Sequence, residues 1–142
     1  MPTQIAYSDA SMRPANPRKK IRALTALGVV IGGVSYSRVR RVASVAEAEL
    51  RAAGYAVSLA QPGHLTLHLD CALSATLLRA PQGKHPMVWL ARAVHRLARL
   101  RGVEMEVVQI SGSDNPAHSV AYGRLKGELD VRRRSAAGAA RT

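Results

Sequence analysis

The chain has 142 residues, one cysteine and a formal net charge of +12, because 21 Lys and Arg oppose nine Asp and Glu. This length predicts one domain that buries about 70% of its unfolded surface, and a single cysteine excludes an internal disulfide framework and fits a reducing compartment. No apolar run approaches the ~20 residues that span a bilayer, so we expect a cytoplasmic protein without a membrane partner.

The first 42 residues carry the pattern of an antiparallel meander. Residues 3–11 alternate like a strand, and residues 12–20 hold two prolines among basic residues, as a loop does. Residues 21–31 and 34–42 are β-branched runs on either side of Gly32-Gly33, and a glycine doublet in that position indicates a hairpin. We therefore expect three antiparallel strands.

From Ser44 onward, helical and strand patterns alternate. Ser44 and Glu47 form a capping box at the start of a helix, and Gly102 is a natural end for a later one. In chain order, the expected elements are a helix from Ser44 to a stop at 61–63, a strand over 65–69, helices over 72–79 and 87–101, a strand over 103–110 and a helix over 116–130.

This order predicts an α/β fold with a mixed five-stranded sheet, three antiparallel strands followed by parallel ones, flanked by helices. We expect residues 1–130 to form the domain. The basic tail, residues 131–142, is expected to have no fixed structure.

Three of the few acidic residues occupy chemically useful places. Asp9 closes an extended run, Glu49 lies in an alanine-rich helix and Asp70 ends a strand. Glu47 precedes Arg51 by four residues, the favourable order for a solvated ion pair, so we expect Glu47 outside and Glu49 against the sheet. The alternatives are an ordinary surface carboxylate at Glu49, a turn former at Asp9 and a helix N-cap at Asp70.

These residues resemble motifs of the ribonuclease H family. Residues 7–11 (YSDAS) are similar to its first-strand motif, residues 48–50 (AEL) to its helical Ala-Glu-Leu, and Leu69-Asp70 before a helix to its fourth-strand Asp. The resemblance covers about residues 3–129, and the element order matches throughout. It implies the ribonuclease H fold.

The resemblance also implies an activity, a metal-dependent endonuclease that hydrolyses the RNA strand of RNA–DNA hybrids by a two-metal mechanism. Two Mg²⁺ or Mn²⁺ ions would activate the attacking water and stabilise the leaving 3′ oxygen. The implied catalytic and metal residues are Asp9, Glu49, Asp70 and His118. The protein is expected to act as a monomer.

The fourth position departs from the family, which usually has Asp where this chain has His118. His118 shares a helical face with Ala121, Tyr122 and Leu125, so we expect it to point inward, either as a core histidine or as a metal ligand. Asp114 is the alternative fourth residue. The loop 111–113 also lacks the histidine that some members carry, and the linker 81–86 is too short for a basic handle.

The positive charge favours nucleic acid as the partner, because clustered Arg and Lys attract phosphate backbones. An Arg-rich composition of genomic origin is the alternative, since 17 of the 21 basic residues are Arg. A catalytically weak or inactive nucleic-acid-binding module and a small ribosome- or nucleoid-associated protein are the competing functions. The candidates for phosphate contact lie in the meander: Arg13, Arg18, Lys19, Lys20, Arg38, Arg40 and Arg41.

Overall fold

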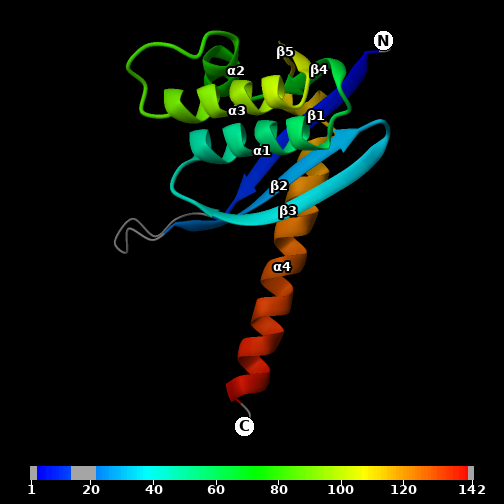
Figure 1. Ribbon diagram of the computed structural model, residues 1–142. Helices are drawn as coiled ribbons and strands as arrows, with labels where there is room; N and C mark the ends of the chain where they lie inside the picture. The colour runs from blue at the N-terminus through cyan, green and yellow to red at the C-terminus, as the bar shows by residue number, and fades with distance from the viewer. Residues whose placement is uncertain (1–2, 14–21, 141–142) are drawn as a thin grey trace.

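The computed structural model describes residues 3–13 and 22–140, which form a mixed sheet with helices on both faces (Figure 1). The elements are β1 (Gln4–Met12), β2 (Ala23–Ile31), β3 (Val34–Val42), α1 (Val45–Leu59), β4 (Gly63–Leu69), α2 (Ala72–Arg79), α3 (Val88–Leu100), β5 (Val103–Gln109), a 3-10 turn (Gly112–Asp114) and α4 (Ala117–Ala140). No helix in these ranges is both long and apolar enough to cross a membrane. The predicted loop at 12–20 lies mostly outside the described residues.

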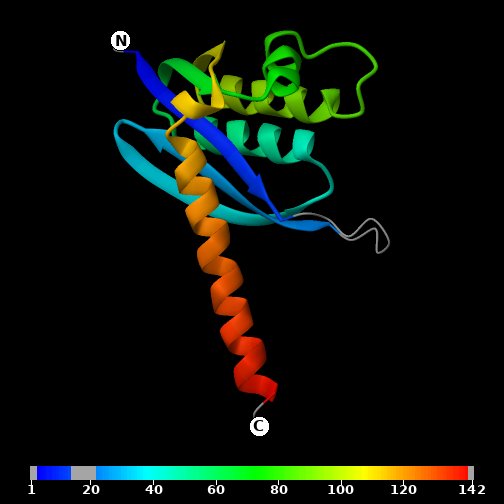
Figure 2. The ribbon, with the colours of Figure 1, turned by 180° about the vertical axis from the view of Figure 1, so that it is seen from behind.

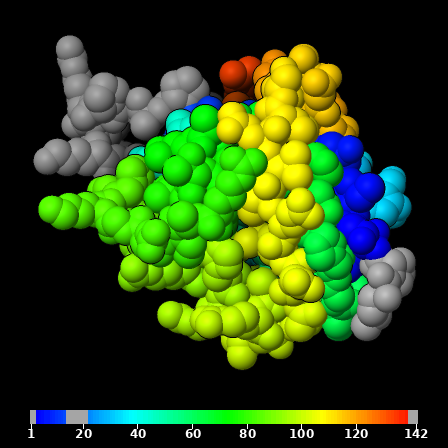
Figure 3. Space-filling view, turned by 90° about the horizontal axis from the view of Figure 1, so that it is seen from above, coloured from blue at the N-terminus to red at the C-terminus, as the bar shows by residue number. Residues whose placement is uncertain are grey.

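The five strands are arranged in the order β3-β2-β1-β4-β5. β1 and β2, and β2 and β3, pair antiparallel, whereas β1 and β4, and β4 and β5, pair parallel. Seen from above, β5, β4 and β1 lie side by side (Figure 3). The predicted α/β fold class is therefore confirmed, including the change from antiparallel to parallel strands.

The hairpin between β2 and β3 forms where the glycine doublet predicted it. Gly32 and Gly33 have φ angles of 58° and 75°. Two consecutive positive φ angles give a turn whose twist matches that of the flanking strands, and glycine adopts them without a steric cost. The turn fixes the register of β3 against β2.

The start of α1 is fixed by the predicted N-cap, Ser44, whereas the side chain of Glu47 bonds one residue earlier than a capping box requires. Ser44 Oγ accepts a hydrogen bond from the backbone N–H of Glu47 at 3.1 Å. Glu47 Oε1 in turn accepts the N–H of Ala43 at 3.2 Å. The first bond satisfies an N–H group that a helix leaves unpaired in its first turn, whereas the second ties α1 to Ala43, the residue before the N-cap. The start of α1 determines which residues of the helix face the sheet.

The main core lies between the sheet and helices α1, α2 and α3. Leu65, Leu67 and Leu69 of β4 are fully buried under these helices. Ala52 and Ala53 of α1 are also fully buried, and such small side chains let a helix pack close to a sheet. A smaller cluster, which includes Leu24, Ala26 and Leu125, joins α4 to the opposite face.

Helix α4 is longer than the sequence predicted. It crosses the far face of the sheet and projects beyond β3 (Figure 2), so the expectation of a helix end near Asp130 and an unstructured segment after it is wrong up to Ala140. Ion pairs one helical turn apart support the extension, with Arg132 Nε 3.3 Å from Glu128 Oε1. The alanines that follow favour helix further.

Candidate metal-binding site

The site is positioned by the parallel pair β1 and β4, whose register ends with Tyr7 opposite His68. Asp9 and Asp70 each follow two residues later, so both carboxylates emerge at the same end of this pair. β1 continues to Met12, and Asp9 is 3% exposed. The interpretations of Asp9 as a strand end or a turn former are therefore wrong, because β2 still pairs with β1 at this point.

Asp70 follows the last residue of β4 and does not cap the next helix. Cys71 occupies the N-cap position of α2, and no side chain makes a capping hydrogen bond there. The capping alternative is thus wrong. The loop after β5 approaches Asp70 closely, since a Cβ atom at Gly112 would lie 3.2 Å from Asp70 Oδ2. Gly112 leaves this carboxylate uncrowded.

Glu49 reaches the same place from α1. It is 6% exposed, and its Oε2 atom is buried without a hydrogen-bond partner, which contradicts the surface-carboxylate alternative. Glu47 pairs with Arg51 at 2.7 Å as expected. Its predicted exposure is wrong, however, because the carboxylate caps Ala43 beneath Arg51 and Glu47 is only 5% exposed.

The structure brings the three carboxylates together. One oxygen from each of Asp9, Glu49 and Asp70 lies within 4.8 Å of the other two. Burial, and then the negative charge of Asp9, raises the pKa of Glu49 to about 9. The same two causes raise the pKa of Asp70, against a hydrogen bond from Asn115 that lowers it. Three carboxylates packed in this way are stable in their ionised form only beside a positive charge.

The donor set fits a hard divalent cation. Mg²⁺ and Mn²⁺ prefer carboxylate oxygens over nitrogen or sulfur, and all three converging groups supply oxygen. The unpartnered Oε2 of Glu49 is the clearest sign, because a buried oxygen without a partner costs free energy. Bound cations would remove both the unsatisfied oxygen and the repulsion between the carboxylates.

His118 lies beside the three carboxylates and not in the core. Its Nδ1 atom is 2.9 Å from Asp9 Oδ2, and its side chain is 65% exposed. Tyr122, which we expected on the same buried face, is 57% exposed and stacks on His118. The core-histidine alternative is therefore wrong. Asp114, the alternative fourth residue, is exposed in the 3-10 turn.

Asn115 is a site residue that the sequence analysis missed. It is 5% exposed, donates from Nδ2 to the carbonyl of Ser8 at 2.9 Å and accepts the N–H of Ala117 at 3.0 Å. It also hydrogen-bonds Asp70. One amide thus joins β1, the end of β4 and the first residue of α4. Asn is a preferred residue at helix starts, and that signal could have identified it.

Gly28 allows α4 to reach the site. It lies opposite Asp9 in the register of β1 and β2, and a Cβ atom there would lie 2.8 Å from both the carbonyl oxygen of Ala117 and the backbone nitrogen of Ala121. Real Cβ atoms do not tolerate such contacts, so any other residue would move the helix. The close approach of α4 brings His118 to Asp9.

The basic residues of the meander do not form one patch. Arg38 pairs across the sheet with Leu27 and lines a groove with α1, whereas Arg41 pairs with Leu24, which packs on the α4 side. Directly paired residues of neighbouring strands share a face, so the two arginines lie on opposite faces. Three of the candidates for phosphate contact lie outside the described residues: Arg18, Lys19 and Lys20.

No protein-family model matches the chain, and no curated protein matches its sequence. Solved ribonuclease H structures, however, share its architecture. The N-terminal ribonuclease H domain of a Mycobacterium tuberculosis protein, solved as a fusion with maltose-binding protein, has a TM-score of 0.70 at 14% identity, over 92% of this chain and 98% of that one.

Two further structures agree. LC11-RNase H1, solved in complex with an RNA/DNA hybrid, has a TM-score of 0.70 at 17% identity, covering 89% of this chain and 99% of that one. RNase H1 from the halophilic archaeon Halobacterium salinarum has a TM-score of 0.67 at 19% identity, with the same coverage of 89% and 99%. At this identity the likeness concerns the fold alone, and the chain has the ribonuclease H fold that its motifs predicted.

Proposed function

We propose that the chain is a divalent-metal-dependent endonuclease that hydrolyses the RNA strand of RNA–DNA hybrids. The observation that carries the proposal is the convergence of Asp9, Glu49 and Asp70 to within 4.8 Å, with a buried and unpartnered oxygen on Glu49. The shared fold adds support, because one protein with this fold, LC11-RNase H1, was solved with an RNA/DNA hybrid.

Asp9, Glu49 and Asp70 would hold Mg²⁺ or Mn²⁺, and His118 would lie at the exposed rim of the site. When bound, two such ions activate a water for in-line attack on the phosphodiester and stabilise the leaving 3′ oxygen. The protein supplies a rigid frame, since β1, α1 and the end of β4 each fix one carboxylate. Glu49 must lose its proton before it can serve as a ligand.

Recognition of the hybrid would depend on contacts that are independent of the base sequence. Arg and Lys side chains would bind phosphates, and 2′-hydroxyl contacts in the shallow minor groove would distinguish the RNA strand. Arg13 and Arg41 are the candidates within the described residues that do not line the groove at α1. The net charge of +12 would strengthen the encounter at low salt.

A second candidate is a nucleic-acid-binding module that cuts weakly or not at all. The contact between His118 and Asp9 favours it, because the imidazole lies 2.9 Å from a carboxylate oxygen that an ion would need. Imidazole is also a poorer ligand for Mg²⁺ than carboxylate. Under this alternative the protein binds hybrids with its fold intact but releases them uncut.

Cleavage of an end-labelled RNA–DNA hybrid in Mg²⁺ or Mn²⁺ tests the proposal. We expect Asp9→Asn and Asp70→Asn to lower the rate by about 10²-fold or more, since each removes a charged ligand. Glu104→Gln is the matched control, because Glu104 is exposed on β5 outside the carboxylate cluster, and it should cut at the wild-type rate.

Three results would count against the nuclease. Folded wild-type protein that cuts no hybrid in either metal, but binds it in preference to duplex DNA, indicates the binding module. Equal binding of hybrid and duplex DNA without cleavage indicates a general basic protein of the ribosome or nucleoid. Cleavage that is unchanged in Asp9→Asn and Asp70→Asn indicates a contaminating nuclease.

A further inference from the structure

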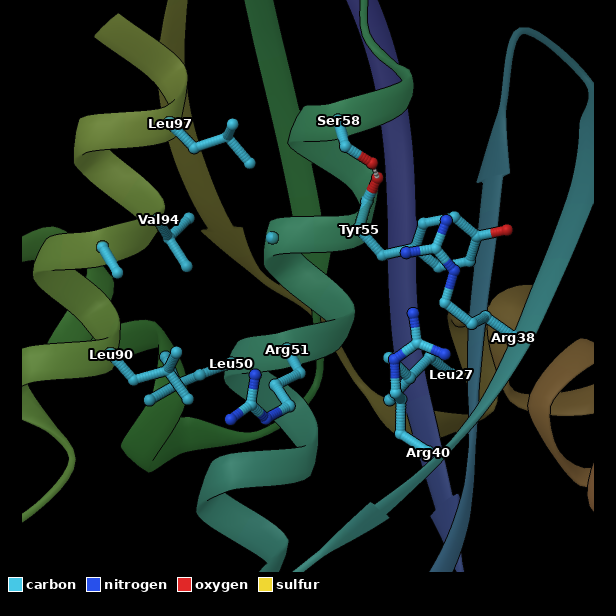
Figure 4. A pocket seen from close by; sticks show the side chains of 12 residues that line it. Leu27, Arg38, Arg40, Leu50, Arg51, Tyr55, Ser58, Leu90, Val94 and Leu97 are labelled. Carbon is cyan, nitrogen blue, oxygen red and sulfur yellow. Dashed lines mark hydrogen bonds between the residues drawn. The ribbon is translucent and has the colours of Figure 1, made fainter. Parts of the chain in front are cut away.

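A groove of about 310 Å³ lies on the helical face, on the opposite side of the sheet from α4. Figure 4 shows Leu90, Val94 and Leu97 of α3 on one side of α1, and Arg38 and Arg40 of β3 on the other. Because its lining residues lie on both sides of α1, the groove crosses this helix. Gly54 is among the α1 residues that line the groove, and it has no side chain to fill it.

The two walls of the groove differ in chemistry. On one side, Ala93 and Leu97 of α3 are half-buried and present apolar surface. On the other side, the exposed guanidinium groups of Arg38 and Arg40 extend from β3, two residues apart and therefore on the same face of the strand. Such a surface matches a ligand that is negative along one side and apolar along the other.

The charge in the groove is available to a ligand. Among the ion pairs of the described residues, none involves Arg38 or Arg40. Arg51 contributes further charge at the edge, although its Nε is already bound to Glu47 at 2.7 Å. Arg40 Nη1 donates to the carbonyl of Val39 at 3.0 Å, which leaves its other N–H groups for a ligand. Guanidinium groups bind carboxylates through two parallel hydrogen bonds, so arginines without an ion pair favour an acidic partner.

Tyr55 fixes Arg38 in the groove. The guanidinium carbon of Arg38 lies 4.4 Å from the centre of the Tyr55 ring, and the Tyr55 hydroxyl donates to the carbonyl of Ser37 at 3.4 Å. This cation–π contact covers a face of the ring. Nucleic-acid bases need exposed aromatic faces for stacking, so the groove favours a peptide over a single strand.

We propose that this groove binds an acidic peptide segment of another protein, with carboxylates on Arg38 and Arg40 and one apolar side chain over Gly54 against Leu97. A second copy of this chain is a poor source of the segment, because it has only nine acidic residues and three of them form the candidate metal site. The inference is independent of the nuclease proposal, since Asp9, Glu49 and Asp70 do not line the groove.

Fluorescence anisotropy at physiological salt tests the groove with two labelled peptides. The first probe has the sequence Glu-Asp-Glu-Asp-Leu-Leu-Asp, and the second replaces both leucines by serine. We expect wild type to bind the leucine probe about fivefold or more tightly than the serine probe, since one buried apolar side chain is worth about 1 kcal/mol or more. Equal binding of the two probes would show that the groove makes no apolar contact with the peptide and attracts it only by positive charge, which would contradict the proposal.

Charge reversal locates the binding surface. Arg38→Glu/Arg40→Glu should weaken binding of the leucine probe about tenfold or more, because two carboxylate contacts become repulsive. Arg96→Glu/Arg99→Glu makes the same change in charge at exposed positions of α3 outside the groove, and it should alter binding by less than about twofold. Equal weakening by both pairs would overturn the proposal.

Filling the groove tests its shape without changing its charge. A Cβ atom at Gly54 would make only an ordinary contact of 3.6 Å with Val94, so a side chain can begin there without a backbone clash, and circular dichroism would verify that Gly54→Leu folds. The leucine side chain should fill the apolar part of the groove and weaken binding of the leucine probe to the level of the serine probe. Unchanged binding by folded Gly54→Leu, or full competition by a single-stranded oligonucleotide, would exclude the peptide groove.

Discussion

His118 and Asp9 are 109 residues apart in the chain, yet Nδ1 of the imidazole lies 2.9 Å from Oδ2 of the carboxylate. The other Asp9 oxygen, Oδ1, accepts the N–H of Ala10 at 2.9 Å. His118 therefore contacts the Asp9 oxygen that does not accept the N–H of Ala10. Under the proposed function, we therefore expect the residue at position 118 to influence which metal the site accepts.

The first prediction concerns metal preference. We expect His118→Asp to raise Mg²⁺-supported hybrid cleavage relative to Mn²⁺-supported cleavage by about tenfold, because a carboxylate is a harder ligand than imidazole. Rates measured in each metal give the ratio. His118→Ala is the control, since it removes the imidazole without adding an oxygen ligand and should leave the ratio near that of wild type. A wild-type ratio in His118→Asp would place residue 118 outside the metal shell.

The second prediction concerns the pH dependence of stability without metal. The pKa of Glu49 is raised from 4.5 to about 9 on folding, so between these values the folded state holds a proton that the unfolded state has lost. The free energy of unfolding should therefore fall as pH rises through this window, by up to about 1.4 kcal/mol per pH unit for one proton. Glu49→Gln should flatten the slope.

Urea unfolding at several pH values, with a chelator present, measures this slope. Glu104→Gln removes an exposed carboxylate on β5 and should retain the wild-type slope. Saturating Mn²⁺ should reduce the slope in wild type, because metal binding favours the ionised carboxylate. A wild-type protein whose stability rises with pH through this window would contradict the burial of an uncompensated carboxyl at Glu49.

The third prediction concerns the packing of α4 on the sheet. Gly28→Ala would place a Cβ atom 2.8 Å from backbone atoms of Ala117 and Ala121, so α4 must move. We expect a loss of about 1–3 kcal/mol in the free energy of unfolding, together with slower hybrid cleavage, since a shift of Ala117 would disturb Asn115, which joins α4 to Ser8 beside Asp9. Thermal denaturation and cleavage assays measure the two effects.

Gly127→Ala, a glycine-to-alanine change within α4 itself, is the control. A Cβ atom at Gly127 meets nothing within 4 Å, and alanine has a higher helix propensity than glycine by about 1 kcal/mol. This variant should therefore be at least as stable as wild type and cut at the same rate. A Gly28→Ala variant as stable as Gly127→Ala would contradict the close approach of α4.

The fourth prediction concerns Asn115. Asn115→Ala removes the donor to Ser8 and the acceptor for Ala117 from a residue that is 5% exposed, and leaving buried groups unpaired costs about 1–3 kcal/mol. We also expect weaker Mn²⁺ binding, because Asn115 hydrogen-bonds Asp70. Calorimetric Mn²⁺ titration of the folded variant measures it. Wild-type Mn²⁺ affinity in Asn115→Ala would limit the amide to a structural role.

The local pattern of the sequence was sufficient for the order and type of the elements. The bounds of β3 and α2 match their predicted ranges, and the predicted N-cap, Ser44, starts α1. These features depend on backbone hydrogen bonds and on side chains a few residues apart, which the sequence contains directly. The order of antiparallel and parallel strands followed from the helices that separate the later strands.

The environment of individual side chains was less predictable. Glu47 forms its predicted ion pair with Arg51. It is nevertheless buried, because its carboxylate also accepts the N–H of Ala43. His118 was expected to point inward and is exposed at the rim. Helical periodicity predicts on which side of the helix a side chain lies. How closely α4 packs on the sheet depends instead on Gly28, which lies in β2.

The sequence alone determined the ribonuclease H fold and the identity of three carboxylates at the ends or faces of its elements. Only the tertiary structure decided that Asp9, Glu49 and Asp70 lie within 4.8 Å of one another, that Asn115 joins the strands that carry them, and that Arg38 and Arg41 face opposite sides of the sheet. The reason is physical, since these relations arise from contacts between distant segments, and their distances are set by packing of the whole domain.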